Sequence, residues 1–165
     1  RDCVVLEIGA APCVFGLALW SAERRGAAEP PRPAAIDHAV ANIQWQHTTA
    51  WAEREAVSQD RPLGAGDGWS EERTGLHVRQ FIETRRHRFT KAVPHDTDGG
   101  VNVLHLVEGD EAVVESSCDG FEPFVVHGAE TFVVPACVGS YTIRPQDGAA
   151  GRPYTTLKAF VRTRA

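Results

Sequence analysis

The sequence contains no methionine and no apolar run long enough to cross a membrane. Its longest apolar stretches, near residues 4–8 and 14–20, are broken by Glu7, Gly9 and Pro12, whereas a spanning helix needs roughly 20 apolar residues. We therefore expect no membrane anchor. Because the chain opens on a strand-like run at residues 3–8, we also expect it to be part of a larger protein whose upstream strands pair with this one.

Metal-binding cysteine motifs and a basic surface are also missing. The four cysteines, Cys3, Cys13, Cys118 and Cys137, form no Cys-x-x-Cys pair, which argues against structural zinc held by cysteine. No secretory leader pattern is present either, so we expect reduced thiols in a cytoplasmic protein. With 17 Lys and Arg against 22 Asp and Glu, the net charge is −5, which excludes a typical nucleic-acid binder.

The motifs of nucleophilic and nucleotide-dependent enzymes are absent as well. The sequence has no Gly-x-Ser-x-Gly, Gly-x-Gly-x-x-Gly, Walker loop or His-Glu-x-x-His. Residues 64–68 are rich in glycine like a phosphate loop, but no lysine-bearing helix follows them. We interpret these residues as linker.

The spacing of apolar residues predicts a helical segment followed by a β domain. Residues 1–20 are typical of two short strands, and residues 24–35 form a proline-rich connector. Residues 35–55 place apolar side chains at helical spacing, and residues 58–75 have the composition of a loop.

After this loop the pattern predicts short strands separated by turn residues, at 76–89, 101–108, 111–116, 122–127, 131–135, 141–144 and 155–162. Strands of this length and spacing are typical of an antiparallel sandwich or barrel. Gly109 and Gly128 are each expected to supply a positive φ and to join antiparallel neighbours.

Two groups of residues resemble the type I mannose-6-phosphate isomerase family. Residues 103–109 and 128–141, with Pro135 ending a strand before Gly139, resemble its last cupin domain. Upstream, residues 5–10, Arg24 and residues 31–33 resemble the segment that follows the zinc-ligand histidine in the long bacterial branch.

The resemblance implies a mainly β fold, a cupin-type antiparallel jelly roll or β-sandwich with a helical segment before it. It also implies three parts: the end of an upstream catalytic cupin and a connector at 1–34, a helix and linker at 35–75, and a metal-free cupin at 76–165.

The family interconverts mannose 6-phosphate and fructose 6-phosphate with zinc as a Lewis acid. Its zinc ligands are a Gln-x-His pair, a Glu and a later His, none of which occurs as a motif here. The resemblance therefore implies that zinc belongs to the upstream cupin of the parent, and that this chain holds no cofactor and is inactive alone. Ala18 also stands where the family has a basic residue.

Candidate site residues come from the upstream segment and from one basic cluster. The resemblance suggests Glu7 and Arg24 as catalytic pocket-lining residues and Arg32 as substrate-binding, although each could instead make a structural hydrogen bond or ion pair. Because side chains alternate along a strand, Arg86 and Arg88 share one face with Arg85 on the other. Arg86 and Arg88 could bind a phosphate or form a charged, solvated sheet edge.

No metal ligands are assigned in the β domain. Cupins that bind metal carry His-x-His and Glu on one strand pair and a later His, but here Tyr141 stands at that last position. We expect His95, His105 and His127 to be satisfied by backbone or solvent.

Two functions stay open. The chain is either the C-terminal part of a zinc-dependent sugar-phosphate isomerase or a metal-free carbohydrate-binding or architectural cupin without catalysis. The expected partners are mannose 6-phosphate or fructose 6-phosphate in the parent and a second copy of the chain in a homodimer, with no nucleic acid and no membrane.

Overall fold

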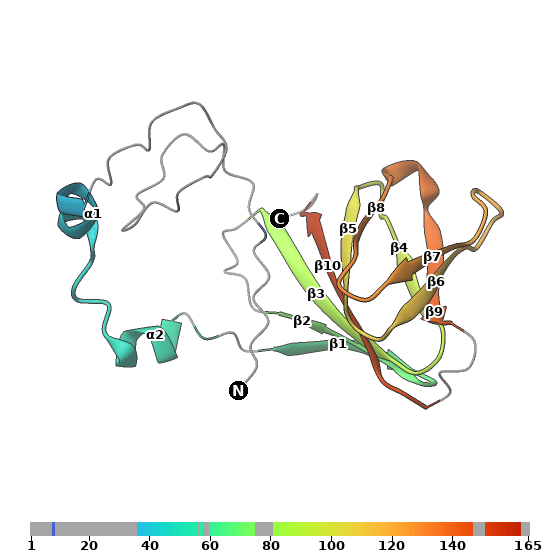
Figure 1. Ribbon diagram of the computed structural model, residues 1–165, viewed down its shortest axis with the longest axis horizontal. Helices are drawn as coiled ribbons and strands as arrows, with labels where there is room; N and C mark the ends of the chain where they lie inside the picture. The colour runs from blue at the N-terminus through green and yellow to red at the C-terminus, as the bar shows by residue number, and fades with distance from the viewer. Residues whose placement is uncertain are drawn as a thin grey trace, which may run out of the picture. The chain divides into compact units, whose positions relative to one another are not determined.

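Helices and strands divide along the chain into two units, Arg1–Val57 and Ser58–Ala165, and each is described by itself. The computed structural model describes residues 8, 36–55, 57, 60–74, 81–146 and 151–162 (Figure 1). Apart from Ile8, the strands expected at 1–20 and the connector expected at 24–35 lie outside the described residues.

Residues 36–55 of the first unit, all of them described, form two short helices where the sequence predicted one. These are α1 (Ile36–Asn42) and α2 (Thr49–Glu55). A turn separates them, in which the His47 amide donates to the Gln44 carbonyl over 2.9 Å. Residues 45–49 are Trp-Gln-His-Thr-Thr, and aromatic and β-branched residues favour the helix less than Ala or Glu do. Among the described residues, no helix has the length and apolar character to span a bilayer.

The second unit is built from two antiparallel sheets that face each other in Figure 1. One sheet has the order β1-β2-β3-β10-β5-β8, and the other has the order β4-β9-β6-β7. This arrangement confirms the prediction of a mainly β, antiparallel fold. The strand bounds are Arg61–Gly66 (β1), Trp69–Arg73 (β2), Ile82–Phe89 (β3), Val93–Asp96 (β4), Asn102–Glu108 (β5), Glu111–Ser116 (β6), Phe124–His127 (β7), Thr131–Val134 (β8), Ser140–Pro145 (β9) and Tyr154–Val161 (β10).

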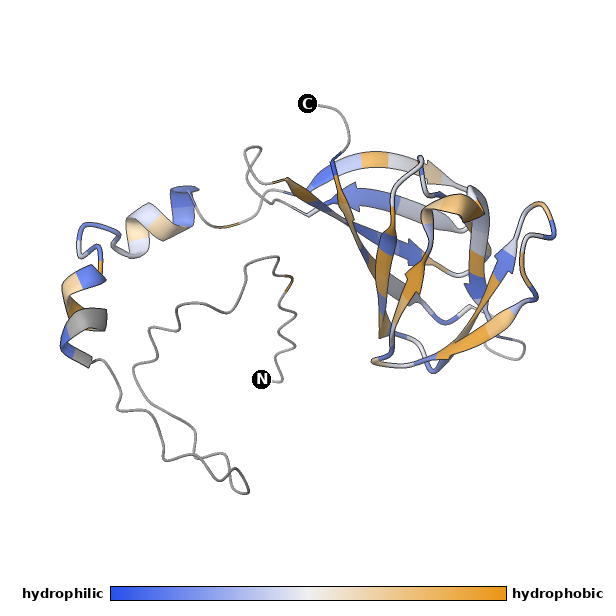
Figure 2. Ribbon diagram, turned by 90° about the horizontal axis from the view of Figure 1, so that it is seen from above, coloured by the Kyte–Doolittle hydropathy of each residue, from blue (hydrophilic) through white to orange (hydrophobic). Residues whose placement is uncertain are grey.

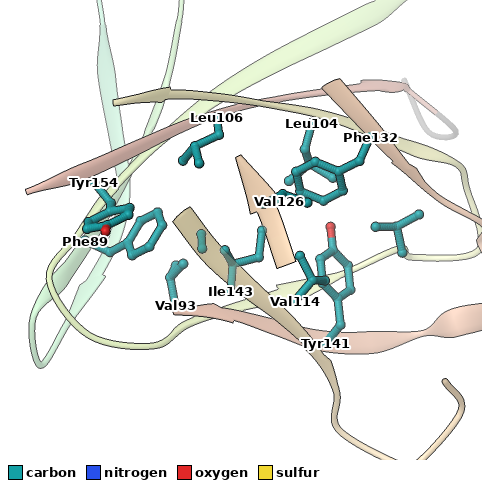
Figure 3. Close-up of a cluster of buried hydrophobic side chains, with 12 residues drawn as sticks. Phe89, Val93, Leu104, Leu106, Val114, Val126, Phe132, Tyr141, Ile143 and Tyr154 are labelled. Carbon is teal, nitrogen blue, oxygen red and sulfur yellow. The ribbon is translucent and has the colours of Figure 1, made fainter. Parts of the chain in front are cut away.

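Side chains alternate between the space enclosed by the sheets and the outside. In β5, the buried Asn102, Leu104 and Leu106 alternate with more exposed residues, as strand geometry requires. Figure 2 shows hydrophobic residues, in orange, on several strands of this unit. Leu104 and Leu106 pack with Val114 and Ile143 of the other sheet (Figure 3). Burying each such side chain stabilises the fold by about 1.5–3 kcal/mol, so this core holds the two sheets together.

Residues 61–73 form a β-hairpin, so the prediction of a loop over residues 58–75 is wrong for this stretch. Strands β1 and β2 pair with each other, and β2 pairs with β3. Gly68 has φ +78° in the turn between β1 and β2, which glycine adopts readily. On β2, the Glu72 carboxylate accepts hydrogen bonds from Arg86 and Arg88 of β3. Cross-strand ion pairs rather than apolar alternation thus accompany the pairing of β2 with β3, and the sequence pattern gave no sign of them.

The two predicted glycine turns connect opposite sheets, which corrects the expectation that they join antiparallel neighbours. β5 leads through Gly109 into β6, and β7 leads through Gly128 into β8, but in each case the two strands lie in different sheets. Gly109 has φ +112°, and a Cβ there would lie 2.1 Å from the Tyr154 ring. At the second turn Ala129 takes the positive φ, 64°. Gly128 is required for space, because its Cβ would lie 2.8 Å from the Gly109 carbonyl oxygen.

Candidate functional site

A pocket of about 390 Å³ opens into the space between the two sheets of the second unit. Strands β2, β3 and β10 of the larger sheet and β4 and β9 of the smaller one contribute to it. Its lining residues are mostly charged or polar: Glu71, Arg85, Pro94, His95, Asp96, Asp98, Ser117, Ser140, Tyr141 and Lys158.

Two basic side chains lie next to each other in this pocket. Arg85 of β3 and Lys158 of β10 are Cα partners across the strand pair, and both lie over the Phe160 ring, at 4.9 and 5.3 Å from its centroid. Lys158 is only 5% exposed. Burial lowers the pKa of Lys158, and the neighbouring Arg85 guanidinium lowers this pKa further.

Glu71 of β2 is the carboxylate that balances part of this charge. Its Oε1 accepts a hydrogen bond from Arg85 Nη1 at 2.9 Å and lies 3.3 Å from His87 Nε2. The contacts with His87 and then with Arg85 lower the pKa of Glu71 to about 2, against the opposing effect of burial. Arg85 Nε also donates to Glu83 over 2.7 Å. Arg85 is therefore paired with carboxylates, whereas the ammonium group of Lys158 has no hydrogen bond or ion pair with any described residue.

Two buried histidines lie behind the basic pair. The rings of His87 and His95 are 4.3 Å apart between centroids, and His95 stacks on Tyr141 at 5.0 Å. Both ring nitrogens of His95, the Nδ1 of His87 and the Oγ1 of Thr156 are buried and have no hydrogen-bond partner among the described residues. Burial, followed by the nearby His87 and Lys158, lowers the pKa of His95 well below its usual value. At neutral pH the ring is therefore an uncharged group with unused polar atoms.

The hydroxyl groups of Tyr141 and Ser140 complete the polar lining. Asn102 Nδ2 donates to the Tyr141 hydroxyl over 3.0 Å, so the hydroxyl keeps its own proton for another acceptor. Ser140 Oγ donates to Asp96 Oδ2 over 2.6 Å. The pocket thus offers hydrogen-bond donors and acceptors, and side chains of both positive and negative charge, around one open volume. A lining of this kind orients a polar ligand.

The residues of the basic cluster lie on the faces that their alternation predicted. Arg85 points into the pocket, while Arg86 and Arg88 lie on the opposite side and pair with Glu72, and Arg86 also pairs with Asp60. Their suggested role in substrate binding stays a prediction, and the structure adds Arg85 as the cluster member in the pocket. Glu7, Arg24 and Arg32 lie outside the described residues.

The candidate histidines do not come together. His95 is buried in the pocket, whereas His105 binds Thr131 at 2.8 Å and His127 lies 3.2 Å from Glu130 at the surface. In the described ranges, no three His, Cys, Asp or Glu side chains are grouped so as to hold a metal ion. The described residues therefore do not fit a zinc centre of the kind that the family carries.

Sequence reasoning missed the residues that form this pocket, namely Glu71, Lys158 and the pair of histidines. A usable signal existed in the composition of the strands. Residues 83–88 of β3 are polar without interruption, so either face of this strand carries polar side chains, and β10 adds Thr156 and Lys158. Both strands are central in their sheet, where polar residues on an inward face indicate a ligand site more often than a solvated surface.

The comparisons with known proteins concern the fold. No protein-family model and no curated protein matches the chain. The mannose 6-phosphate isomerase from Bacillus subtilis superposes with a TM-score of 0.57 and 12% identity, over 78% of this chain and 35% of that one.

Two smaller proteins are also similar. An RmlC-like cupin from Shewanella frigidimarina has a TM-score of 0.47 and 21% identity over 64% of this chain and 86% of its own. KdgF from Halomonas sp. has a TM-score of 0.46 and 13% identity over 62% of this chain and 86% of its own.

The two antiparallel sheets and the likeness to the isomerase show that the β domain has a jelly-roll fold of the cupin type. At these identities the likeness shows the fold alone, and the chain corresponds to about a third of the length of the isomerase, 35%. The pocket is lined by residues of both sheets of this fold.

Proposed function

We propose that the cupin domain binds a small anionic carbohydrate, such as a sugar phosphate, in its interior pocket without a metal ion. The observation that carries this proposal is Lys158, a buried lysine that faces the pocket beside Arg85 and has no carboxylate paired with it among the described residues. A bound anion would supply the missing counter-charge.

The magnitudes favour a ligand over a purely structural lysine. Burying an ammonium group costs several kcal/mol, and the contact of Lys158 with the Phe160 ring offsets about 0.5–2 kcal/mol of this cost. The neighbouring Arg85 adds repulsion, because both groups are cations. An anionic group between Lys158 and Arg85 would remove both penalties, and the hydroxyl groups of a sugar could use Ser140, Tyr141 and His95.

The parent that best fits this domain is a mannose-6-phosphate-isomerase-like protein. Support comes from the sequence resemblance and from the isomerase fold match, which extends over 78% of this chain. In this proposal the catalytic zinc belongs to an upstream cupin, and mannose 6-phosphate or fructose 6-phosphate is the ligand. The unpaired Cys118 and Cys137 suit a cytoplasmic protein.

The test is a binding titration of the folded chain, by calorimetry or by NMR chemical shifts, with mannose 6-phosphate and with mannose. We expect the phosphorylated sugar to bind more tightly, and Lys158→Met to weaken its binding about 10- to 100-fold. Losing a charged hydrogen bond costs about 1.5–3 kcal/mol, and each 1.4 kcal/mol corresponds to about a factor of ten.

Lys91→Met is the matched control, because Lys91 is exposed and pairs with Asp67 at 2.7 Å away from the pocket. It should bind as the unchanged chain does. Equal affinity for both sugars, or equal affinity of the two variants for mannose 6-phosphate, would contradict the proposal.

An architectural role in a homodimer is a second proposal. Val103 of β5 and Val133 of β8 are Cα partners on the outer face of the larger sheet, and they are 39% and 56% exposed. Strand β8 is the last strand in the order of that sheet. An edge strand with exposed valines favours contact with a second chain.

A further inference from the structure

The chain contains two lysines, and they lie in opposite environments. The side chain of Lys91 is 61% exposed and forms an ion pair with Asp67. Lys158 is 5% exposed and lines the pocket, and its ammonium group has no hydrogen bond or ion pair that involves a described residue. The Nζ atom of Lys158 is therefore the one side-chain amine in the described residues that combines burial with access to a pocket.

The charged and titratable groups around Lys158 come from four other parts of the cupin domain. They are Glu71 of β2, Arg85 and His87 of β3, His95 and Asp96 of β4, Asp98 after it, and Tyr141 of β9.

The carboxylates among these groups are mostly engaged elsewhere. Glu71 binds Arg85 and His87, and Asp96 binds Ser140 and the Asp98 amide. Burial first and Arg85 second lower the pKa of Lys158, while Glu71, Asp98 and Asp96 act in the opposite direction and do not reverse the shift. A desolvated amine beside another cation has a larger neutral, nucleophilic fraction than a surface lysine.

We propose that the ε-amino group of Lys158 condenses reversibly with the carbonyl group of a small anionic carbonyl compound bound in this pocket, forming an imine. The inference rests on the proposed function, since it places a reactive carbonyl on the anionic ligand of the same site. Arg85 would hold the anionic group, because its Nη2 takes part in neither of its two ion pairs with Glu71 and Glu83.

The condensation needs no oxidant, reductant or metal. The lone pair of Nζ attacks the carbonyl carbon, the carbonyl π electrons move to oxygen, and the proton lost by nitrogen is gained by that oxygen. The resulting carbinolamine takes up a second proton on its hydroxyl group and releases water as the nitrogen lone pair forms the C=N bond. The iminium nitrogen then loses its proton and leaves the neutral imine. Amine and carbonyl thus give imine and water.

Two neighbouring side chains are placed to move these protons. Tyr141 accepts a hydrogen bond from Asn102 and can donate its own proton into the pocket. His95 has two ring nitrogens without a partner among the described residues. Donors and acceptors that line the same pocket provide the general acid and base that both proton transfers need.

The experiment traps the imine chemically. The folded chain is incubated at neutral pH with glyoxylate, a small aldehyde that carries a carboxylate, and with cyanoborohydride, which reduces an imine to a stable secondary amine. Peptide mass spectrometry then measures carboxymethylation at Lys158 and Lys91. We expect Lys158 to react at least about tenfold faster, since a bound carbonyl is held near the amine. Inorganic phosphate in excess should protect Lys158 and leave Lys91 unchanged.

Variants separate reaction from binding. Lys158→Arg keeps the positive charge but has no nucleophilic amine, so this variant should still bind glyoxylate but show no modification in the pocket. Lys91→Arg should still be modified at Lys158. Circular dichroism and thermal unfolding show whether each variant is folded. Modification at equal rates in both lysines, or a lack of protection by phosphate, would overturn the inference.

A separate titration with glyoxylate and with mannose 6-phosphate tells the two proposals apart. Binding that depends on Lys158 without any trapped imine would refute the imine and leave the anion site standing. Absence of binding for both ligands would refute both proposals.

Discussion

Lowering the pH should destabilise the cupin domain through His87 and His95. Burial lowers the pKa of both imidazoles below the ordinary value of 6.5, and most strongly that of His95. In the unfolded chain both rings take up a proton as the pH falls below about 6.5, whereas burial in the folded barrel opposes this protonation. The unfolded state then binds more protons than the folded state, so the free energy of unfolding decreases toward acidic pH.

The expected magnitude follows from the slope of this linkage. Each histidine held neutral contributes about 1.4 kcal/mol per pH unit below its unfolded pKa. Between pH 7 and pH 5 this amounts to about 2 kcal/mol for His95 and up to about 4 kcal/mol for both rings together. Glu71, whose pKa is about 2 in the fold, loses its contribution only as the pH falls from its unfolded value of 4.5 toward 2. The window from pH 7 to pH 5 therefore reports on the histidines.

Urea unfolding followed by tryptophan fluorescence at several pH values measures this slope. His95→Phe keeps an aromatic ring against Tyr141 and should remove at least about half of the loss between pH 7 and pH 5. Tyr141→Phe is the matched control: it removes the hydrogen bond from Asn102, which costs about 1 kcal/mol at every pH, and should keep the slope. A free energy of unfolding that is constant over this range, or a slope unchanged in His95→Phe, would refute the reasoning.

Three further outcomes are expected. Gly109→Ala should cost at least about 3 kcal/mol, because its Cβ would lie 2.1 Å from the Tyr154 ring. Gly99→Ala, with φ +74° and open space, should cost only about 1 kcal/mol, and thermal unfolding of the two variants compares them. The isolated chain should not isomerise mannose 6-phosphate even with added zinc, and zinc-dependent turnover by the purified chain would contradict this. If the exposed valines mediate a homodimer, Val133→Glu should shift the mass measured by light scattering from dimer to monomer, whereas a monomeric unchanged chain would rule that contact out.

The sequence by itself determined the fold class and the facing of individual strand residues. Short runs of apolar and β-branched residues between turn residues predicted strands at 101–108 and 155–162, where the structure has β5 and β10. The alternation of side chains along a strand placed Arg85 opposite to Arg86 and Arg88, as the structure has them. The positions of the strands and the faces of their residues depend on local backbone geometry, which can be predicted from the pattern of neighbouring residues.

Tertiary structure decided which of these side chains meet. Strands β1 and β2 were predicted as a loop, because the pairing of β2 with β3 involves ion pairs between residues far apart in the sequence, such as Glu72 and Arg86. The pocket likewise joins Glu71, His95 and Lys158, which come from three strands in two sheets. Which residues share an interior depends on strand register and on how the sheets close, and a shift of one residue would exchange the inner and outer faces. The register of the strands and the closure of the sheets depend on the packing of the whole barrel, so no single segment of the sequence predicts them.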